Sequence, residues 1–299
     1  MCLKKIIIKD NMKLRVKRFD PSTLKPHRII LVVGKRGTGK SVLQRDLMYH
    51  MCNKVDFGLA FSPTEETQDM FRQHMPDSWI YPGFSTAKLD TMLKMQRDMC
   101  KTKNQRNLFI IMDDCMYDKK ILKGLGIRDL FMNGRHMHIT LCNAVQYVMD
   151  IGPDLRTQVD YVFALRENII SNKSKLWKYF FGMFEKYDDF AKVMDKCTQN
   201  HGCLVMDNTT GSCNVDECIF WYKAEYNLPD FQFGSSVFHK ISQKYIKSEQ
   251  DRILEEIEEK EMEKMMATSK EKKRISCIQM EDSKGNVLLE KNNGLIRLT

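Results

Sequence analysis

The chain has 299 residues, a hydrophobic fraction of 42% and a formal net charge of +9. Its length and apolar content allow one large packed core, alone or with a small appendage. No apolar stretch is long enough to span a membrane, and the N-terminal apolar run meets charge too soon for a signal peptide. We therefore expect no membrane span and no secretion, with the ten cysteines kept reduced. The positive charge weakly favours a polyanionic partner.

The first predicted strands, 14–19 and 28–33, are separated by a turn-rich segment at 20–22. The second strand leads into residues 34–41, which read GKRGTGKS and match the phosphate-binding pattern G-x-x-x-x-G-K-[ST]. A helix is predicted over 40–52, where apolar residues recur with helical spacing. Strand, loop and helix in this order bind phosphate, because the glycines aim backbone N–H groups at the anion and the helix presents its positive end.

The pattern gives separate roles to its last residues. Lys40 supplies a positive charge to the β- and γ-phosphates, and the Ser41 hydroxyl completes a Mg²⁺ shell. A glycine-rich turn with an adventitious lysine is the alternative, which the flanking strand and helix disfavour. The residues expected to hold the nucleotide are Gly34, Lys35, Arg36, Gly37, Thr38, Gly39, Lys40, Ser41 and Val42.

Strands and helices alternate after this helix. The predicted strands lie at 57–61, 79–81, 108–112, 139–142 and 161–165. The predicted helices begin at Thr64 or lie at 86–100 and 119–133. This alternation predicts an α/β fold with a mainly parallel sheet and helices on both faces.

The alternation of predicted strands and helices ends toward the C-terminus. Segments 202–206 and 218–222 flank a turn rich in Asn, Thr and Gly, which predicts a β-hairpin that closes the domain. Residues 239 to about 274 predict a charged helix, which is typical of a solvated face; a docking arm for another subunit or for capsid protein is the alternative. We therefore expect a P-loop ATPase domain over 1–238 and a charged helical C-terminal extension over 239–299.

Two adjacent carboxylates follow the apolar segment 108–112. In P-loop enzymes the first acid at this place holds Mg²⁺ through water, which is the role expected for Asp113. The next acid orients or deprotonates the attacking water, which is the role expected for Asp114. Most hydrolysing enzymes have Glu there, and Asp is one methylene shorter. Alternatively, the two acids only cap the next helix.

Gln146 follows the strand predicted at 139–142. In the hydrolysing branch of P-loop enzymes an extra strand lies between the two motif strands, and a polar sensor lies at the tip of the next strand. A side-chain amide there could sense the γ-phosphate or position water, so we expect Gln146 to act as the sensor. In isolation, a glutamine after a strand is usually an ordinary loop residue.

Taken together, these motifs resemble a known family. The phosphate loop, the Asp113–Asp114 pair, the segment 132–136 (MNGRH) and Gln146 occur in an order similar to that of the DNA-packaging ATPases of large double-stranded DNA viruses. These are poxvirus-type members of the FtsK–HerA superfamily, and the resemblance covers roughly residues 18–226. It implies a RecA-like P-loop NTPase core that uses ATP and Mg²⁺.

The resemblance also implies partners and a location. Members of this family form homo-oligomeric rings that hydrolyse ATP and pull double-stranded DNA into a preformed capsid, so capsid or portal protein is a further expected partner. The implied location is the host cytoplasm, at the viral assembly site, or the virion.

A ring ATPase needs an arginine that completes the site of a neighbouring subunit. Such a residue stabilises the charge on the transferring phosphoryl group. Arg135 is the first candidate, and Arg156 and Arg166 flank the last predicted core strand. Each could instead have a surface or salt-bridging role.

A motor that acts on any DNA sequence should contact phosphates rather than bases. Two groups of lysines could do so, although each lysine could equally face solvent. They are Lys119, Lys120 and Lys123, and Lys173, Lys175 and Lys178.

Two other functions fit a phosphate loop. A nucleoside or nucleotide kinase would need an arginine-rich lid, which we do not find in the sequence. A nucleotide-dependent assembly protein with little turnover would be consistent with the shortened acid at Asp114.

Overall fold

The computed structural model describes residues 4–7, 13–102, 104–115, 124–212 and 214–244, positions 257, 261 and 265, and the segments 277–281, 287–292 and 295–297. The chain divides into two compact units, Met1–Ile246 and Lys247–Thr299. Lys119, Lys120, Lys123 and the beginning of the helix predicted at 119–133 lie outside the described residues.

Ten strands of the described part of the first unit form one sheet, in the order β1-β2-β10-β9-β8-β3-β7-β6-β4-β5. Their bounds are Lys4–Ile7 (β1), Lys13–Arg18 (β2), Ile29–Val33 (β3), Phe57–Phe61 (β4), Ile80–Tyr81 (β5), Leu108–Asp113 (β6), Ile139–Val145 (β7), Tyr161–Ala164 (β8), Gly202–Asp207 (β9) and Ile219–Lys223 (β10). From β8 to β5 neighbouring strands are parallel, which confirms the predicted parallel sheet. β7 lies between β3 and β6, so the extra strand expected between the two motif strands is present.

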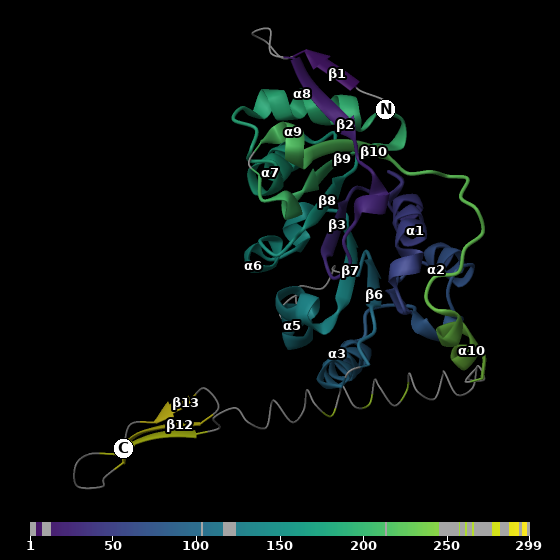
Figure 1. Cartoon of the computed structure of the whole chain (residues 1–299). Helices are drawn as coiled ribbons and strands as arrows, with labels where there is room; N and C mark the ends of the chain where they lie inside the picture. Colours follow the sequence, from purple (N-terminus) through teal and green to yellow (C-terminus); the bar gives the residue numbers. More distant parts are fainter. Residues whose placement is uncertain are drawn as a thin grey trace. The chain divides into compact units, whose positions relative to one another are not determined.

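Helices cover both faces of this sheet (Figure 1). Residues of α1 and α2 pack with one face, and residues of α3, α5, α7 and α8 pack with the other. The bounds are Lys40–Met51 (α1), Glu65–Arg72 (α2), Thr86–Lys101 (α3), Leu125–Asn133 (α5), Pro153–Arg156 (α6), Ile170–Phe180 (α7), Tyr187–Cys197 (α8), Val215–Cys218 (α9) and Ser236–Lys244 (α10). The molecule is therefore a three-layer α/β/α structure in this unit.

The central strands are buried on both faces. Every residue of β3, β6 and β7 is buried. In β3, Ile30 and Val32 belong to the core on the α1 side, and Leu31 and Val33 belong to the core on the other side. A strand covered on both faces needs an uninterrupted apolar run, which is the pattern in the sequence.

The predicted hairpin is present, with additions. β9 and β10 are antiparallel, with Ile219 opposite Met206 and Lys223 opposite Gly202, and the short helix α9 lies in their connection. The sequence analysis missed α7 and α8, which precede the hairpin. The signal was there in α8, since the buried residues recur at the i, i+3, i+4 and i+7 positions of a helix. They are Phe190, Val193, Met194 and Cys197.

The second unit contains strands that the sequence analysis did not predict. β11 (Cys277–Glu281), β12 (Val287–Asn292) and β13 (Leu295–Arg297) form an antiparallel sheet within the extension that we expected to be helical. The helix α10 includes the beginning of the charged helix predicted from 239 to about 274, and most of the remainder of that prediction lies outside the described residues. Across the described parts of the chain, no helix is both long and apolar enough to cross a membrane.

Candidate nucleotide-binding site

The predicted motifs meet at one edge of the sheet. The phosphate loop follows β3, the two carboxylates lie at the end of β6, and Gln146 follows β7. In the parallel register Val33 pairs with Val145, and Asp113 pairs with Ala144. Because parallel strands present their carboxyl ends at the same edge, residues from distant parts of the sequence lie close together here.

A cavity of about 880 Å³ opens at this edge, which is the size of a small-molecule site. It brings most of the predicted nucleotide contacts together with both carboxylates and the sensor. Its lining residues are Arg36, Gly37, Gly39, Lys40, Ser41, Val42, Pro63, Thr64, Glu66, Thr67, Asp113, Asp114, Gln146, His201, Lys223, Ala224 and Tyr226.

The remaining predicted loop residues shape the loop instead of lining the cavity. A Cβ at Gly34 would lie 2.6 Å from the Thr38 Oγ1 atom and 2.8 Å from the Leu165 Cβ atom, so only glycine fits there. The Thr38 hydroxyl donates to the Lys35 carbonyl at 2.7 Å, and the Lys35 ammonium pairs with Glu167 at 2.9 Å. These residues were expected to hold the nucleotide as part of the loop; their side chains hold the loop in shape, and phosphate contacts from their backbone N–H groups stay a prediction.

The loop leaves the beginning of α1 open to an anion. Gly37 and Gly39 have φ angles of +77° and +101°, which favour glycine. Gly39 is the N-cap of α1, and no side chain caps the helix there. The first N–H groups of a helix lack intrahelical partners and attract negative charge, so this end of α1 suits phosphate.

Two predicted catalytic side chains contact the same carboxylate oxygen of a third. The Lys40 Nζ atom lies 3.2 Å from the Asp114 Oδ2 atom, and the Gln146 Nε2 atom donates to the same oxygen at 3.0 Å. Lys40 is 7% exposed, so its charge is poorly screened by water. Asp114 has a φ of +49°, an uncommon conformation for a residue other than glycine and one often found at functional sites.

Asp113 is a buried carboxylate that is only partly satisfied. Its Oδ2 atom accepts from the Ser62 hydroxyl at 3.3 Å, while its Oδ1 atom is buried without a hydrogen-bond partner among the described residues. Burial and the neighbouring Asp114 charge raise the pKa of Asp113 to about 6, although Lys40 opposes this shift. An acidic oxygen without a partner fits a cation ligand or a metal-bound water.

The residues present fit Mg²⁺ in the way that nucleotide enzymes hold it. The Ser41 hydroxyl lines the same cavity as Asp113 and lies 3.5 Å from the Thr67 hydroxyl. Within the described residues, no group of three His, Cys, Asp or Glu side chains could hold a metal alone. Mg²⁺ is commonly held by one or two protein oxygens together with substrate phosphates and water, which matches this sparse set of ligands.

The raised pKa of Asp113 predicts a stability cost that depends on pH. A carboxyl whose pKa rises from 3.8 to about 6 on folding destabilises the metal-free protein by up to about 3 kcal/mol above pH 6. The cost shrinks as pH falls from 6 toward 4 and is gone below 3.8, where both states are protonated. Without Mg²⁺ and nucleotide, Asp113→Asn should therefore be more stable than the wild type at pH 8 and lose this advantage near pH 4. Denaturant unfolding of both proteins at several pH values would test this; an advantage independent of pH would contradict it.

The structure separates the three candidate finger arginines. Arg135 is exposed in a 3-10 turn, Gly134–Met137, that precedes β7, so it lies at the opposite edge of the sheet from the cavity. Arg156 is buried; its Nε atom donates to the Ile151 carbonyl at 2.9 Å, and its guanidinium lies 4.1 Å from the centroid of the Tyr179 ring. Arg166 is exposed beyond the carboxyl end of β8. Arg135 therefore does not contribute to the cavity of its own chain, and a role in a neighbour's site stays a prediction.

The lysines of α7 are largely engaged within the fold. Lys173 is buried and pairs with Asp195 at 2.6 Å, and the Lys175 ammonium bonds the Tyr147 hydroxyl. Of this group only Lys178 is exposed. The group is therefore a poor candidate for DNA contacts.

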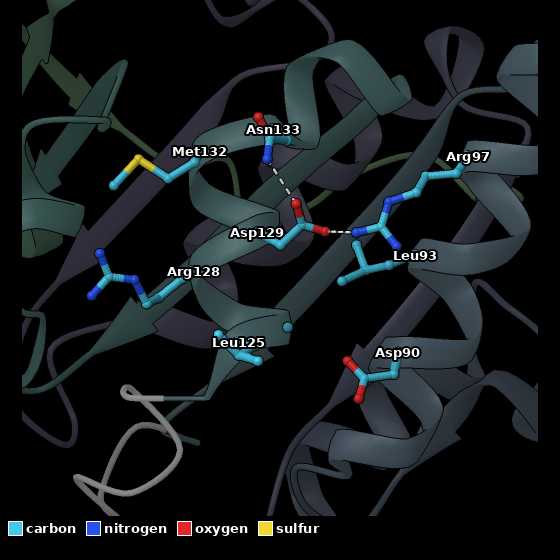
Figure 2. Close-up of a pocket in the computed structure, with 9 residues that line it drawn as sticks. Asp90, Leu93, Arg97, Leu125, Arg128, Asp129, Met132 and Asn133 are labelled. Carbon is cyan, nitrogen blue, oxygen red and sulfur yellow. Dashed lines mark hydrogen bonds and ion pairs between the residues drawn. The ribbon is translucent and has the colours of Figure 1, made fainter.

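A second cavity, of about 500 Å³, lies between α3 and α5 (Figure 2). It contains none of the predicted site residues. Asp129 pairs there with Arg97 and accepts a hydrogen bond from Asn133 at 2.7 Å, and Arg128 pairs with Asp154 at 3.0 Å. These polar groups are thus largely satisfied by the protein itself, and we do not assign the cavity a role in nucleotide chemistry.

One wall of the nucleotide cavity was not predicted from the sequence. No nucleotide contact was expected after Gln146, yet four lining residues come from the β9–β10 region. They are His201, Lys223, Ala224 and Tyr226. No motif marks them, because their place beside the phosphate loop depends on the pairing of distant strands.

Comparison with known proteins finds relatives in large DNA viruses. No model of a known protein family matches the chain. An uncharacterized protein of Acanthamoeba polyphaga mimivirus is 33% identical over 250 residues, which are 80% of this chain and 87% of that protein. One of Frog virus 3 is 35% identical over 202 residues, 66% of this chain and 62% of that protein. One of Invertebrate iridescent virus 3 is 27% identical over 256 residues, 81% of this chain and 98% of that protein.

Among solved structures, the genome packaging NTPase of Sulfolobus turreted icosahedral virus 2 in complex with AMP has a TM-score of 0.52 to this chain. The match covers 68% of this chain and all of that one, at 16% sequence identity. At this identity the likeness concerns the fold, and it confirms the RecA-like P-loop NTPase architecture expected from the sequence.

Proposed function

Because this chain belongs to the family of the mimivirus protein, we propose that it is a P-loop ATPase of the FtsK–HerA superfamily, an ATP-hydrolysing motor that moves double-stranded DNA into a viral capsid. The observation that carries the proposal is the convergence of Lys40, Asp114 and Gln146 beside an uncapped helix N-terminus. This arrangement combines phosphate binding with groups that can act on water.

The geometry supports in-line attack of water on the γ-phosphorus. The phosphates lie at the beginning of α1, where Lys40 neutralises charge on the β- and γ-oxygens. Gln146 orients the water, and Asp114 accepts its proton as the new P–O bond forms and the bond to the β-phosphate oxygen breaks. The products are ADP and inorganic phosphate. Mg²⁺, held by Ser41 and through water by Asp113, would supply further positive charge to the phosphates.

Three different observations support the motor function and its partners. The relatives come from viruses with large DNA genomes, the fold is that of a genome packaging NTPase, and the net charge of +9 suits a polyanion. We infer a homo-oligomeric ring, in which Arg135 would act on the site of a neighbour, and a location at the viral assembly site or in the virion.

DNA should stimulate hydrolysis if the chain is a motor. We expect phosphate release by the purified chain to rise severalfold when long double-stranded DNA is added, since translocation couples turnover to the DNA track. Heparin, which carries charge without a duplex, is the matched polyanion and should not stimulate. Measurement at several salt concentrations would show the stimulation weakening as phosphate contacts are screened. Turnover that DNA leaves unchanged would contradict the motor function.

One observation favours a second function, an assembly protein that binds ATP with little turnover. Asp114 is shorter than the usual acid, and its Oδ2 atom is already bonded to Lys40 and Gln146. Tight ATP binding without phosphate release, with or without DNA, would identify this function.

A further inference from the structure

Two chemically different groups of residues line the nucleotide cavity. Asp113, Asp114 and Gln146 suit the γ-phosphate and the attacking water. His201, Lys223, Ala224 and Tyr226 come from the β9–β10 region. Tyr226 is the aromatic residue of this second group, and none of the roles assigned above to phosphate chemistry uses it.

Tyr226 is held against α1, the helix whose N-terminus forms part of the phosphate site. The Arg45 guanidinium on α1 donates to the Tyr226 carbonyl and lies 5.4 Å from the centroid of the Tyr226 ring. The ring is 71% exposed, so Arg45 covers only part of it. A cation against one face of an aromatic ring holds the ring in place and leaves the remaining area available.

A buried aspartate on α1 also holds the segment that contains Tyr226 in place. Asp46 is fully buried on α1; it accepts a hydrogen bond from the Tyr222 hydroxyl at 2.5 Å and one from the Glu225 N–H at 3.1 Å. These bonds tie the end of β10 and the residues after it to α1. Tyr226 is therefore held at a fixed position relative to the phosphate loop, although the two lie far apart in the sequence.

Helix geometry gives the direction from the phosphates to Tyr226. Val42 lines the cavity, and Arg45 lies three residues later on the same face of α1, about 5 Å along the axis. If the γ-phosphate is directed toward Asp114, a nucleotide that runs along α1 past Val42 would reach the Tyr226 ring, which lies against Arg45.

The wall also contains backbone strain near the loop. Asn200 and His201 both have positive φ angles, 53° and 60°. A Cβ built at Gly39 would lie 3.8 Å from the His201 Nδ1 atom, so the imidazole is close to the last glycine of the phosphate loop. Strain of this kind persists where the surrounding structure enforces it, and it is common at ligand sites.

We propose that Tyr226, backed by Arg45, stacks on the base of the bound nucleoside triphosphate. This inference rests on the proposed nucleotide site and adds its base-binding part. An exposed aromatic ring stacks on any base through its π face. Asp46 acts as a positioning residue, because it contacts the Tyr226 segment and not the base.

The test compares a ligand that has a base with one that has none. Calorimetry would give the affinities of AMPPCP and of inorganic tripolyphosphate, each with Mg²⁺, for the wild type, Tyr226→Ala and Tyr226→Phe. The alanine variant should bind AMPPCP roughly tenfold more weakly while its affinity for tripolyphosphate is unchanged. The phenylalanine variant keeps the ring and should match the wild type on both ligands. The exposure of Tyr226 makes misfolding of these variants a small risk.

Two results would overturn the base subsite. They are a Tyr226→Ala variant that binds AMPPCP as tightly as the wild type, and one that loses both ligands equally. Lys40→Ala separates this failure from that of the proposed function, because it should weaken both ligands through the lost phosphate contact. If Lys40→Ala binds both ligands normally, the nucleotide site itself is wrong.

Discussion

ATP hydrolysis should fall by about a hundredfold or more in the Lys40→Ala variant, since one preorganised charge at a transferring phosphoryl group has an effect of this size. The ammonium is 7% exposed and lies where the γ-phosphate is expected, so water cannot replace it efficiently. The substitution has a second effect. Lys40 is the cation that opposes the rise in the pKa of Asp113, so its loss leaves the two carboxylates without compensation. The Mg²⁺ dependence of the residual rate should shift as well.

The measurement is phosphate release from Mg²⁺-ATP. Lys94→Ala is a matched control, because Lys94 is an exposed lysine on α3 and lines neither cavity. It should retain the wild-type rate. If Lys40→Ala also keeps most of the activity, the phosphate loop does not serve hydrolysis in this protein.

Local sequence patterns predicted the site residues that lie at the ends of individual strands. The phosphate loop, Asp113, Asp114 and Gln146 each follow a buried strand, and parallel strands bring such ends together. The extra strand between the two motif strands was expected from the hydrolysing branch of P-loop enzymes, and β7 lies at that place. Sequence reasoning works here because each residue's position depends on its own strand and on a common edge.

Other residues could not be placed in this way. Arg135 is close to the sensor strand in the sequence, but it precedes β7, and that end of the strand faces away from the cavity. Tyr226 reaches the cavity only because β10 pairs with β9 and because Arg45 and Asp46 hold the following segment. The Arg45 and Asp46 contacts join residues about 180 positions apart, and no local periodicity encodes them.

Asp114→Asn should lower the turnover number by about a hundredfold or more while leaving ATP affinity close to that of the wild type, as expected when only a general base is lost. Asparagine has nearly the same shape and also tolerates the left-handed conformation at φ +49°, so the substitution removes the basic oxygen with little added strain. An alanine substitution would remove the basic oxygen and also change the side-chain shape and the backbone strain, so its effect would be less informative. Single-turnover hydrolysis and a separate binding measurement would distinguish turnover from affinity.

Two neighbouring variants make this prediction specific. Asp113→Asn should act mainly through the metal, so raising Mg²⁺ should restore part of its activity but none of that of Asp114→Asn. Asp114→Glu adds the methylene that most hydrolysing relatives of this fold possess. If it hydrolyses ATP faster than the wild type, then the short acid limits turnover and the assembly function gains support. If it is slower, the Lys40–Asp114–Gln146 spacing is already adjusted to aspartate. Wild-type turnover by Asp114→Asn would instead exclude Asp114 as the base and direct attention to Glu66, the third carboxylate in the cavity lining besides Asp113 and Asp114.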